Sequence, residues 1–360
     1  MDSGQTPSPS GNAKRILSVD AMGGDKGPAP VIAGMADVAK KFDDVSFIVH
    51  GKKSDLSRMI NKRKALRGRC EIRHCEDEVS MTDKPSHVMR HGKGTSMWSA
   101  VQSVKSGEAN VCVSCGNTGA LMALSMLTLR KIPGITRPAI AILWPSRNEF
   151  GFNVMLDVGA DIKADAQDLL QYAFMGVSYA RNGLDIARPR VGLLNVGTED
   201  HKGRPELHEA FDLIEAYQSV ANYDFVGFVE GGDIPGDRTD VIVTDGFTGN
   251  VALKTGEGTA KLIGELLREA FKYSPLSRLA QLLAITSLGR LKKRIDPRRV
   301  NGGVFLGLNG TVVKSHGSAD ATGVSAALKL ALRLDQTQLT QKIAARVASI
   351  DTIHHDKAEE

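Results

Sequence analysis

Glycine-rich turns that each follow a short apolar run are the feature of this chain that most constrains its fold. Residues 16–19, 111–115, 152–156 and 240–243 are such runs, and the turns after them begin at Asp20, Gly116, Asp157 and Thr244. A strand that ends in a turn and leads into a helix is the unit of a parallel sheet, and the turn points backbone N–H groups beyond the strand end. The pattern therefore predicts an α/β protein with a site for phosphate or a similar oxyanion.

Apolar, β-branched runs alternate with helical stretches along almost the whole chain. Strands are expected at residues 15–19, 46–50, 71–75, 110–114, 139–144, 152–157, 190–195, 225–230, 240–244 and 303–313, and helices at 28–41, 118–129, 164–182, 207–220 and 249–271. The strands are apolar on both faces, which is typical of a parallel sheet covered by helices. We therefore predict a three-layer α/β/α, Rossmann-like fold.

The two ends of the chain depart from this alternation. Residues 1–13 are rich in Ser, Pro and Gly and are expected to form a disordered tail, and the polar residues 351–360 a second tail. Because no long linker divides residues 14–350, they are expected to form one catalytic α/β unit or two interleaved subdomains. No run reaches the ~18–20 apolar residues that span a bilayer, and no export signal is evident.

Four cysteines occur, and two of them have the spacing of a metal or redox motif. Cys112 and Cys115 lie at the end of a predicted strand, where residues three apart point to opposite faces. There is no second CxxC, so we interpret both as small buried side chains and expect no metal. So few cysteines indicate a reducing, cytosolic setting.

Positive charge is concentrated in two stretches. Residues 52–73 hold nine basic and two acidic side chains, and residues 261–299 hold ten basic and three acidic ones, in a chain of net charge +5. Such concentration indicates an acidic partner: a carrier protein, an anionic membrane or a nucleic acid.

Residues 274–294 place apolar and basic side chains at roughly helical spacing. The candidate contact residues are Leu276, Leu279, Leu283, Arg290, Lys292, Lys293 and Arg294. Pro275 suits a first helical turn and Gly289 can bend the segment. The sequence predicts a protruding helical hairpin, about residues 262–296, that lies on a membrane surface, mediates dimerisation or docks on the core.

Familiar nucleophile and cofactor motifs are absent from the sequence. It contains no Gly-x-Ser-x-Gly elbow, no HExxH, no phosphate loop ending in Gly-Lys-Ser/Thr, and no G-x-G-x-x-G after the first predicted strand. Nicotinamide binding therefore has little support, and no cofactor is expected.

Polar residues and glycines at the strand ends remain as candidates. Asn117 and Thr118 either cap a helix or contact substrate while the helix N-terminus holds phosphate. Asn250 and Lys254 are four apart and share a helix face. Asn195 and His316 follow strands, at the edge where ligands bind.

These candidates divide into two sets. The predicted phosphate- or acyl-binding residues are Asp20, Gly23, Gly24, Gly116, Asn117, Thr118, Gly119, Gly246, Thr248 and Gly249. The predicted catalytic residues are Lys254, His316, Asn195, Asn250 and Asp245.

Taken in order, the motifs resemble those of the bacterial phosphate acyltransferase family of phospholipid synthesis. The matching stretches run from about residue 15 to 335: Val19-Asp-Ala-Met-Gly-Gly-Asp25, Gly116-Asn-Thr-Gly-Ala-Leu-Met122, Gly134-Ile-Thr-Arg-Pro-Ala139, Leu156-Asp-Val-Gly-Ala160, Leu193-Leu-Asn-Val-Gly197, Val243-Thr-Asp-Gly-Phe-Thr-Gly-Asn250, Gly307-Leu-Asn-Gly310 and His316-Gly317. One departure is Asp161, where the family usually has Asn.

The resemblance implies an enzyme that makes acyl phosphate from acyl-[acyl carrier protein] and inorganic phosphate. It also implies a fold like that of the isocitrate/isopropylmalate dehydrogenase and phosphotransacetylase group, a homodimer, and no nucleic-acid partner. The enzyme would be cytoplasmic, with peripheral contact at the inner face of the cell membrane. Its product would pass to a glycerol-3-phosphate acyltransferase.

For this reaction we expect phosphate in the turns at 116–119 and 246–249, with Lys254 balancing its charge. Asn195, Asn250 or His316 would polarise the thioester carbonyl, and His316 would protonate the leaving sulfur. A phosphotransacetylase acting on acyl-CoA, an isocitrate-type dehydrogenase and a non-catalytic regulator that binds carrier or membrane are the competing interpretations.

Overall fold

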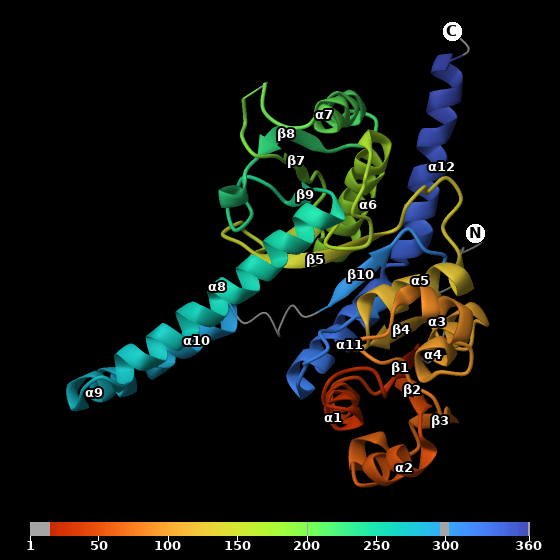
Figure 1. Ribbon diagram of the computed structural model, residues 1–360, viewed down its shortest axis with the longest axis vertical. Coiled ribbons are helices and arrows are strands. Elements are labelled where there is room, and N and C mark those ends of the chain that lie inside the picture. Colours follow the sequence, from red (N-terminus) through yellow and green to blue (C-terminus); the bar gives the residue numbers. More distant parts are fainter. Residues whose placement is uncertain (1–14, 200, 296–301, 359–360) are drawn as a thin grey trace, which may run out of the picture.

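The chain folds around one 11-stranded sheet, in a computed structural model that describes residues 15–199, 201–295 and 302–358 (Figure 1). The predicted tail at 1–13 lies outside these residues. The strands are β1 Arg15–Asp20, β2 Val45–Gly51, β3 Cys70–His74, β4 Val111–Ser114, β5 Ala139–Pro145, β6 Phe152–Leu156, β7 Arg190–Leu194, β8 Asp224–Val229, β9 Val241–Val243, β10 Gly303–Leu306 and β11 Thr311–Lys314.

Helices connect these strands. They are α1 Pro28–Ala39, α2 Lys53–Asn61, α3 Pro85–His91, α4 Ser96–Lys105, α5 Thr118–Leu129, α6 Ala166–Leu184, α7 Pro205–Tyr217, α8 Gly246–Lys272, α9 Pro275–Leu283, α10 Ile285–Ile295, α11 Ala321–Gln336 and α12 Leu339–Ala358. The five helical ranges expected from the sequence correspond to α1, α5, α6, α7 and α8. The backbone of α12 continues through residues 351–358, where the sequence analysis expects a polar tail.

The sheet is mixed rather than parallel throughout, which corrects the sequence prediction. Its strand order is β3-β2-β1-β4-β11-β10-β5-β6-β9-β7-β8. The expected strand at 303–313 is two antiparallel strands, β10 and β11, because Gly307 takes a φ of 88° that turns the chain back. Antiparallel pairings join β11 to β10, β10 to β5 and β5 to β6, so the two outer parallel groups of strands run in opposite directions.

Helices cover both faces of the sheet, because successive strand residues point to opposite sides. Val111 and Val113 of β4 belong to one apolar cluster, together with Leu328 of α11. Cys112, between the two valines, belongs to the other cluster, with Leu121 of α5. Cys115 packs in the first cluster, so the interpretation of the two cysteines as buried side chains on opposite faces is confirmed.

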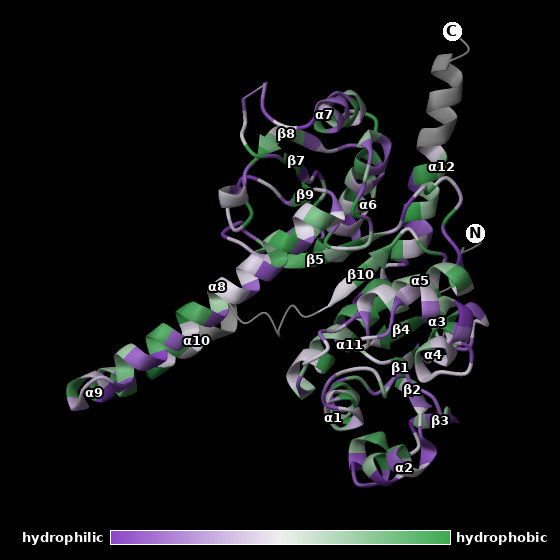
Figure 2. Cartoon of the chain, viewed as in Figure 1, coloured by the Kyte–Doolittle hydropathy of each residue, from purple (hydrophilic) through white to green (hydrophobic). Residues whose placement is uncertain are grey.

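The helices α8, α9 and α10 form an arm that extends from the sheet (Figure 1). Only Gly246 and Gly249 of the 27-residue α8 are buried. Apolar residues recur along all three helices (Figure 2), and many are exposed, including Leu262, Leu266, Leu276, Leu279, Leu283 and Ile285. Within the described residues, no helix combines the length and apolarity needed to cross a bilayer.

Candidate active site

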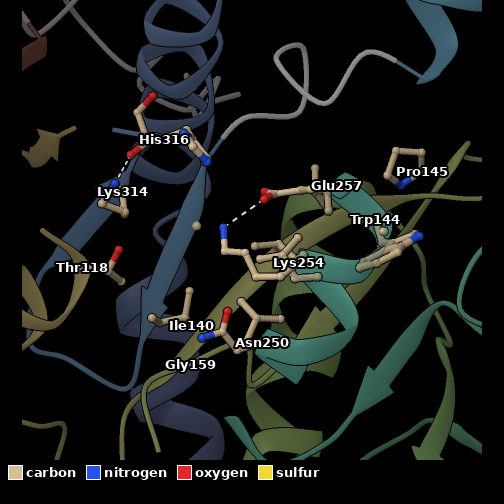
Figure 3. Close-up of a pocket in the computed structure, with 18 of the residues that line it drawn as sticks. Thr118, Ile140, Trp144, Pro145, Gly159, Asn250, Lys254, Glu257, Lys314 and His316 are labelled. Carbon is tan, nitrogen blue, oxygen red and sulfur yellow. Dashed lines mark hydrogen bonds and ion pairs between the residues drawn. The ribbon is translucent and has the colours of Figure 1, made fainter. Parts of the chain in front are cut away.

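A cavity of about 540 Å³ lies at the centre of the sheet, where the two parallel groups of strands meet (Figure 3). The first turn of α5, strands β5, β10 and β11, the turn after β6 and the first half of α8 surround it. Polar side chains gather at one end, near Thr118 and Lys314. Trp144 and Pro145 lie at the other end, with Lys254 between the two ends (Figure 3).

Five of the residues proposed from the sequence line this cavity together. They are Thr118, Gly119, Asn250, Lys254 and His316. They come from three distant segments, and Asn250 and Lys254 share the face of α8 that their spacing predicts.

The N-terminus of α5 supplies an anion-attracting element at the polar end. The side chain of Asn117 caps this helix, accepting a hydrogen bond from the Ala120 N–H at 3.0 Å. Its amide nitrogen donates to the carbonyl oxygens of Met81 (2.9 Å) and Asp83 (3.0 Å). Asn117 therefore positions the helix, and the first-turn residues Thr118 and Gly119 face the cavity, where N–H groups have no acceptor within the helix.

Lys314, at the end of β11, is a buried cation in the cavity wall. Its ammonium donates to the carbonyl oxygens of Cys115 (3.3 Å) and Ser315. Burial lowers the pKa of Lys314 to about 8, and the positive charge of Lys254 also lowers it. Near neutral pH this side chain is still mostly protonated, so it can both attract an anion and release a proton.

His316 lies beside Lys314 and is neutral at neutral pH. Burial is the main cause that lowers its pKa, while the nearby carboxylate of Glu257 opposes the shift. The ring Nδ1 accepts from the Ser318 N–H at 3.2 Å, and the Ser318 hydroxyl lies 2.9 Å from it, so Nε2 carries the ring proton. A neutral imidazole donates a hydrogen bond but is a poor proton donor for a leaving group.

Lys254 of α8 is held by an ion pair. Its ammonium lies 2.9 Å from a carboxylate oxygen of Glu257, one turn further along the helix (Figure 3). The lysine side chain is 59% exposed, so this contact mainly sets its direction. Asn250, one turn before Lys254, lies against the turn at Gly159.

The turn after β1 does not line the cavity. Asp20 is buried and accepts hydrogen bonds from the Ser96 and Ser114 hydroxyls, at 2.8 and 2.7 Å, and from the N–H groups of Met22 and Gly23. Burial raises its pKa. These bonds tie the turn to its neighbours, so Asp20, Gly23, Gly24 and Gly116 support the site and are not part of its wall.

The turn before α8 is also engaged within the protein. Asp245 caps α8 by accepting from the Thr248 N–H and hydroxyl, and it pairs with Arg204 at 2.6 Å. Gly246 donates its N–H to the Asp161 carbonyl. A Cβ on Gly249 would lie 1.9 Å from the Asp157 carbonyl oxygen, so glycine is required for close packing.

These contacts correct the expectation that the turn at 246–249 cradles phosphate. The N–H groups of Gly246, Thr248 and Gly249 all donate to acceptors of the protein itself.

Asn195 lies after β7 and does not line the cavity. Its side chain donates to the Lys202 carbonyl at 2.9 Å and accepts from the Val196 N–H. It therefore shapes the loop at 195–203, which corrects its expected place beside the substrate carbonyl.

The predicted membrane- or carrier-contact residues lie on the arm, away from this cavity. Leu276, Leu279 and Leu283 of α9 are 75%, 53% and 79% exposed, and Arg290 of α10 is also exposed. The side chains of Lys292, Lys293 and Arg294 lie outside the described part of the chain.

Among the residues that line the cavity and that sequence reasoning missed are Lys314, Glu257 and Trp144. A charged residue at the end of an apolar strand, as in Val312-Val-Lys314, is a signal that points to Lys314. Glu257 lies one helical turn after Lys254. No local pattern marks Trp144, because its place depends on the packing of α8 across β5.

No group of three or more metal-ligating side chains occurs in the part of the chain that the structure describes. The cysteines are free, and burial raises the pKa of each thiol, to about 11 for Cys115 and about 12 for Cys70. None of them lines the cavity.

Solved structures of other proteins share this fold. The chain is similar to the EutD phosphotransacetylase from Staphylococcus aureus, with a TM-score of 0.57 and 16% identity over 90% of this chain and 94% of that one. A branched-chain phosphotransacylase from Enterococcus faecalis gives 0.56 and 14%, over 89% and 99%. At these identities the likeness concerns the fold, which is that of the phosphotransacylases.

Sequence similarity defines the family more narrowly. A family profile described as "Fatty acid synthesis protein" matches residues 16–342. The phosphate acyltransferase of Roseobacter denitrificans is 70% identical over 347 residues, 96% of this chain and 97% of the relative. That of Ruegeria pomeroyi is 68% identical over 354 residues, 98% and 95%. The chain therefore belongs to the phosphate acyltransferase family, enzymes of fatty acid and phospholipid synthesis.

Proposed function

We propose that this enzyme transfers an acyl group from the thioester of acyl carrier protein to inorganic phosphate, forming acyl phosphate. The observation that carries the proposal is the division of the cavity into a cationic end and an apolar end with Lys254 between them. Such a site accommodates an anion and an acyl group side by side.

Phosphate itself is the nucleophile in this proposal. Near neutral pH a large share of inorganic phosphate is the dianion, which attacks a thioester without a strong general base. It would bind between the first turn of α5 and Lys314. One of its oxygens bonds to the thioester carbon and forms a tetrahedral oxyanion.

Hydrogen bonds to that oxyanion come from Asn250 and the Nε2–H of His316, both in the cavity wall. One preorganised donor of this kind contributes about 3–4 kcal/mol to transition-state stabilisation. Lys254 adds positive charge beside it.

The carbon–sulfur bond then breaks, and the thiolate leaves. We assign its proton to Lys314 rather than to His316, because a group with a pKa near 8 donates well to a thiol with a pKa of about 8.5. No cysteine is suited to an acyl-enzyme step, since the buried thiols have raised pKa values and lie outside the cavity wall.

The test is phosphate-dependent loss of the acyl-carrier thioester with matching formation of acyl phosphate. Lys254→Ala and His316→Ala should each lower kcat/KM by about 10² or more while the protein stays folded. Near-wild-type rates for both variants would remove these roles.

The same assay distinguishes the competing functions. A higher kcat/KM with acyl-CoA than with acyl carrier protein would favour a phosphotransacetylase. Binding of carrier without turnover would favour a regulator. Phosphate-independent reduction of a nicotinamide would favour a dehydrogenase of the isocitrate type, the other group whose fold the family resemblance implies.

We further propose that the enzyme is a cytoplasmic homodimer whose arm touches the anionic inner surface of the cell membrane. The exposed apolar residues of α8 and α9 support a partner or a lipid surface, since such patches rarely face water alone. Membrane contact would place acyl phosphate, a reactive amphipathic product, near a glycerol-3-phosphate acyltransferase.

A further inference from the structure

The apolar end of the cavity is a continuous wall built from two elements. Strand β5 contributes Ile142, Trp144 and Pro145, and α8 contributes Leu253 and Ala260. The wall begins next to Lys254, where the proposed reaction places the thioester carbonyl (Figure 3). A chain attached to that carbonyl and turned away from the phosphate must enter this half of the cavity.

Trp144 packs directly on the backbone of α8 at this end. A Cβ on Gly256 would lie 2.6 Å from the indole Cη2 and 2.7 Å from Cζ2. Only a residue without a Cβ leaves room for the indole at this distance. Gly256 therefore allows the Trp144 side chain to lie against α8. The indole joins β5 to α8 at the end of the cavity opposite Lys314 (Figure 3).

We infer that this apolar half binds the acyl chain, and that Trp144, seated on Gly256, closes it and limits the length of chain that the enzyme accepts. The inference rests on the proposed function, because it takes the carbonyl to lie beside Lys254. It goes further by naming the subsite and the residue that determines specificity.

The hydrophobic effect gives the inference a quantitative form. Each methylene that moves from water into an apolar site favours binding by a factor of about four. With wild-type enzyme, kcat/KM should therefore rise by about fourfold per added methylene and then level off or fall, once the chain reaches the indole.

The experiment measures kcat/KM for a series of saturated acyl-carrier thioesters, from medium to long chains, with the full-length enzyme. Trp144→Ala should extend the rise to longer chains, by about fourfold for each methylene beyond the wild-type limit, and leave medium chains nearly unchanged. Trp144→Phe retains an aromatic stop and should keep a limit close to the wild-type one.

Gly256→Ala tests the packing of the Trp144 indole against α8 independently. Its methyl group occupies the position of the ring, so the indole must move and the length limit must change, while the KM for phosphate stays the same. Phe150→Ala is the matched control: Phe150 is an exposed aromatic residue close to β5 in sequence that does not line the cavity, so its profile should follow the wild type.

The possible outcomes separate the inference from the proposed function. Parallel profiles for wild type, Trp144→Ala and Gly256→Ala, with acyl phosphate still formed, would overturn the role of Trp144 and leave the reaction intact. Absence of acyl phosphate at every chain length in the wild type would overturn the proposed function itself. A melting temperature for each variant shows that the compared proteins are folded.

Discussion

At the scale of single residues, Lys314 is unusual because lysine side chains are rarely buried. It is 8% exposed, and its ammonium is bonded to two backbone carbonyl groups. Charged groups around it act in both directions: Asp20 and Asp25 favour its protonated form, and Lys254 disfavours it. Burial is the largest effect and favours the neutral amine.

The lowered pKa of Lys314 predicts that the reaction slows in alkaline solution. The folded-state pKa of Lys314 is lowered from 10.5 to about 8, so its ammonium form predominates below pH 8 and is lost above it. If that proton goes to the leaving thiolate, kcat should fall by about tenfold per pH unit above pH 8. Lys314→Arg cannot release a proton in this range, so its kcat should be lower throughout and should lack this decline within the range where the protein is folded, whereas His316→Ala should retain the decline. A decline that is unchanged in Lys314→Arg would contradict the assignment.

At the scale of elements, local signals predicted where helices begin more reliably than what their first residues do. Asn117 was expected at a helix start, and it caps α5. Asp245 was predicted as a catalytic residue in the turn before a helix expected from residue 249, and it caps α8, which begins at Gly246. Capping could be predicted from residue type, because Asn and Asp side chains accept hydrogen bonds from backbone N–H groups two or three residues later in the chain. The sequence could not predict which of the two turns faces a cavity, since that depends on neighbours far away in sequence.

The arm formed by α8, α9 and α10 is expected to bind a lipid surface. Its α9 residues Leu276, Leu279 and Leu283 are exposed, and their replacement by Ser should lower binding to anionic phospholipid vesicles by tenfold or more, as measured by co-sedimentation. Activity with carrier thioesters in solution should change little, because these side chains do not line the cavity. Unchanged vesicle binding would argue that the apolar residues serve the dimer instead.

At the scale of the whole molecule, charge is distributed over separate surfaces. Within residues 52–73, the Arg69 guanidinium donates to the carbonyl oxygens of Ala39, Phe42 and Val45, so it stabilises the fold. Arg73 pairs with Glu108. The exposed basic residues that remain for a partner are Lys53, Arg58, Lys62, Lys64 and Arg67.

These exposed cations predict salt-sensitive recognition of an acidic carrier protein. The KM for acyl carrier protein should rise steadily as ionic strength increases, since a Debye length of about 8 Å at physiological salt already screens exposed charges. Arg58→Glu combined with Lys62→Glu should raise that KM several-fold with little change in kcat. Lys105→Glu, at an exposed position on α4, is the charge-matched control. If neither salt nor charge reversal changes the KM, the carrier protein does not bind at this surface.

By itself, the sequence determined the elements whose signals are local. The β4–α5 and β9–α8 units follow from apolar runs, caps and glycines that lie within a few residues of each other, and the ordered motifs were sufficient to indicate the family. Tertiary structure alone decided that β10 and β11 reverse the direction of the sheet at its centre, because strand pairing joins residues that are far apart in sequence. That reversal brings Lys314, Thr118 and Lys254 to one cavity and leaves Asn195 and Asp245 outside it. Burial is likewise a property of the packed molecule, so the lowered pKa of Lys314 and the seat of Trp144 on Gly256 cannot be obtained from residue type or spacing.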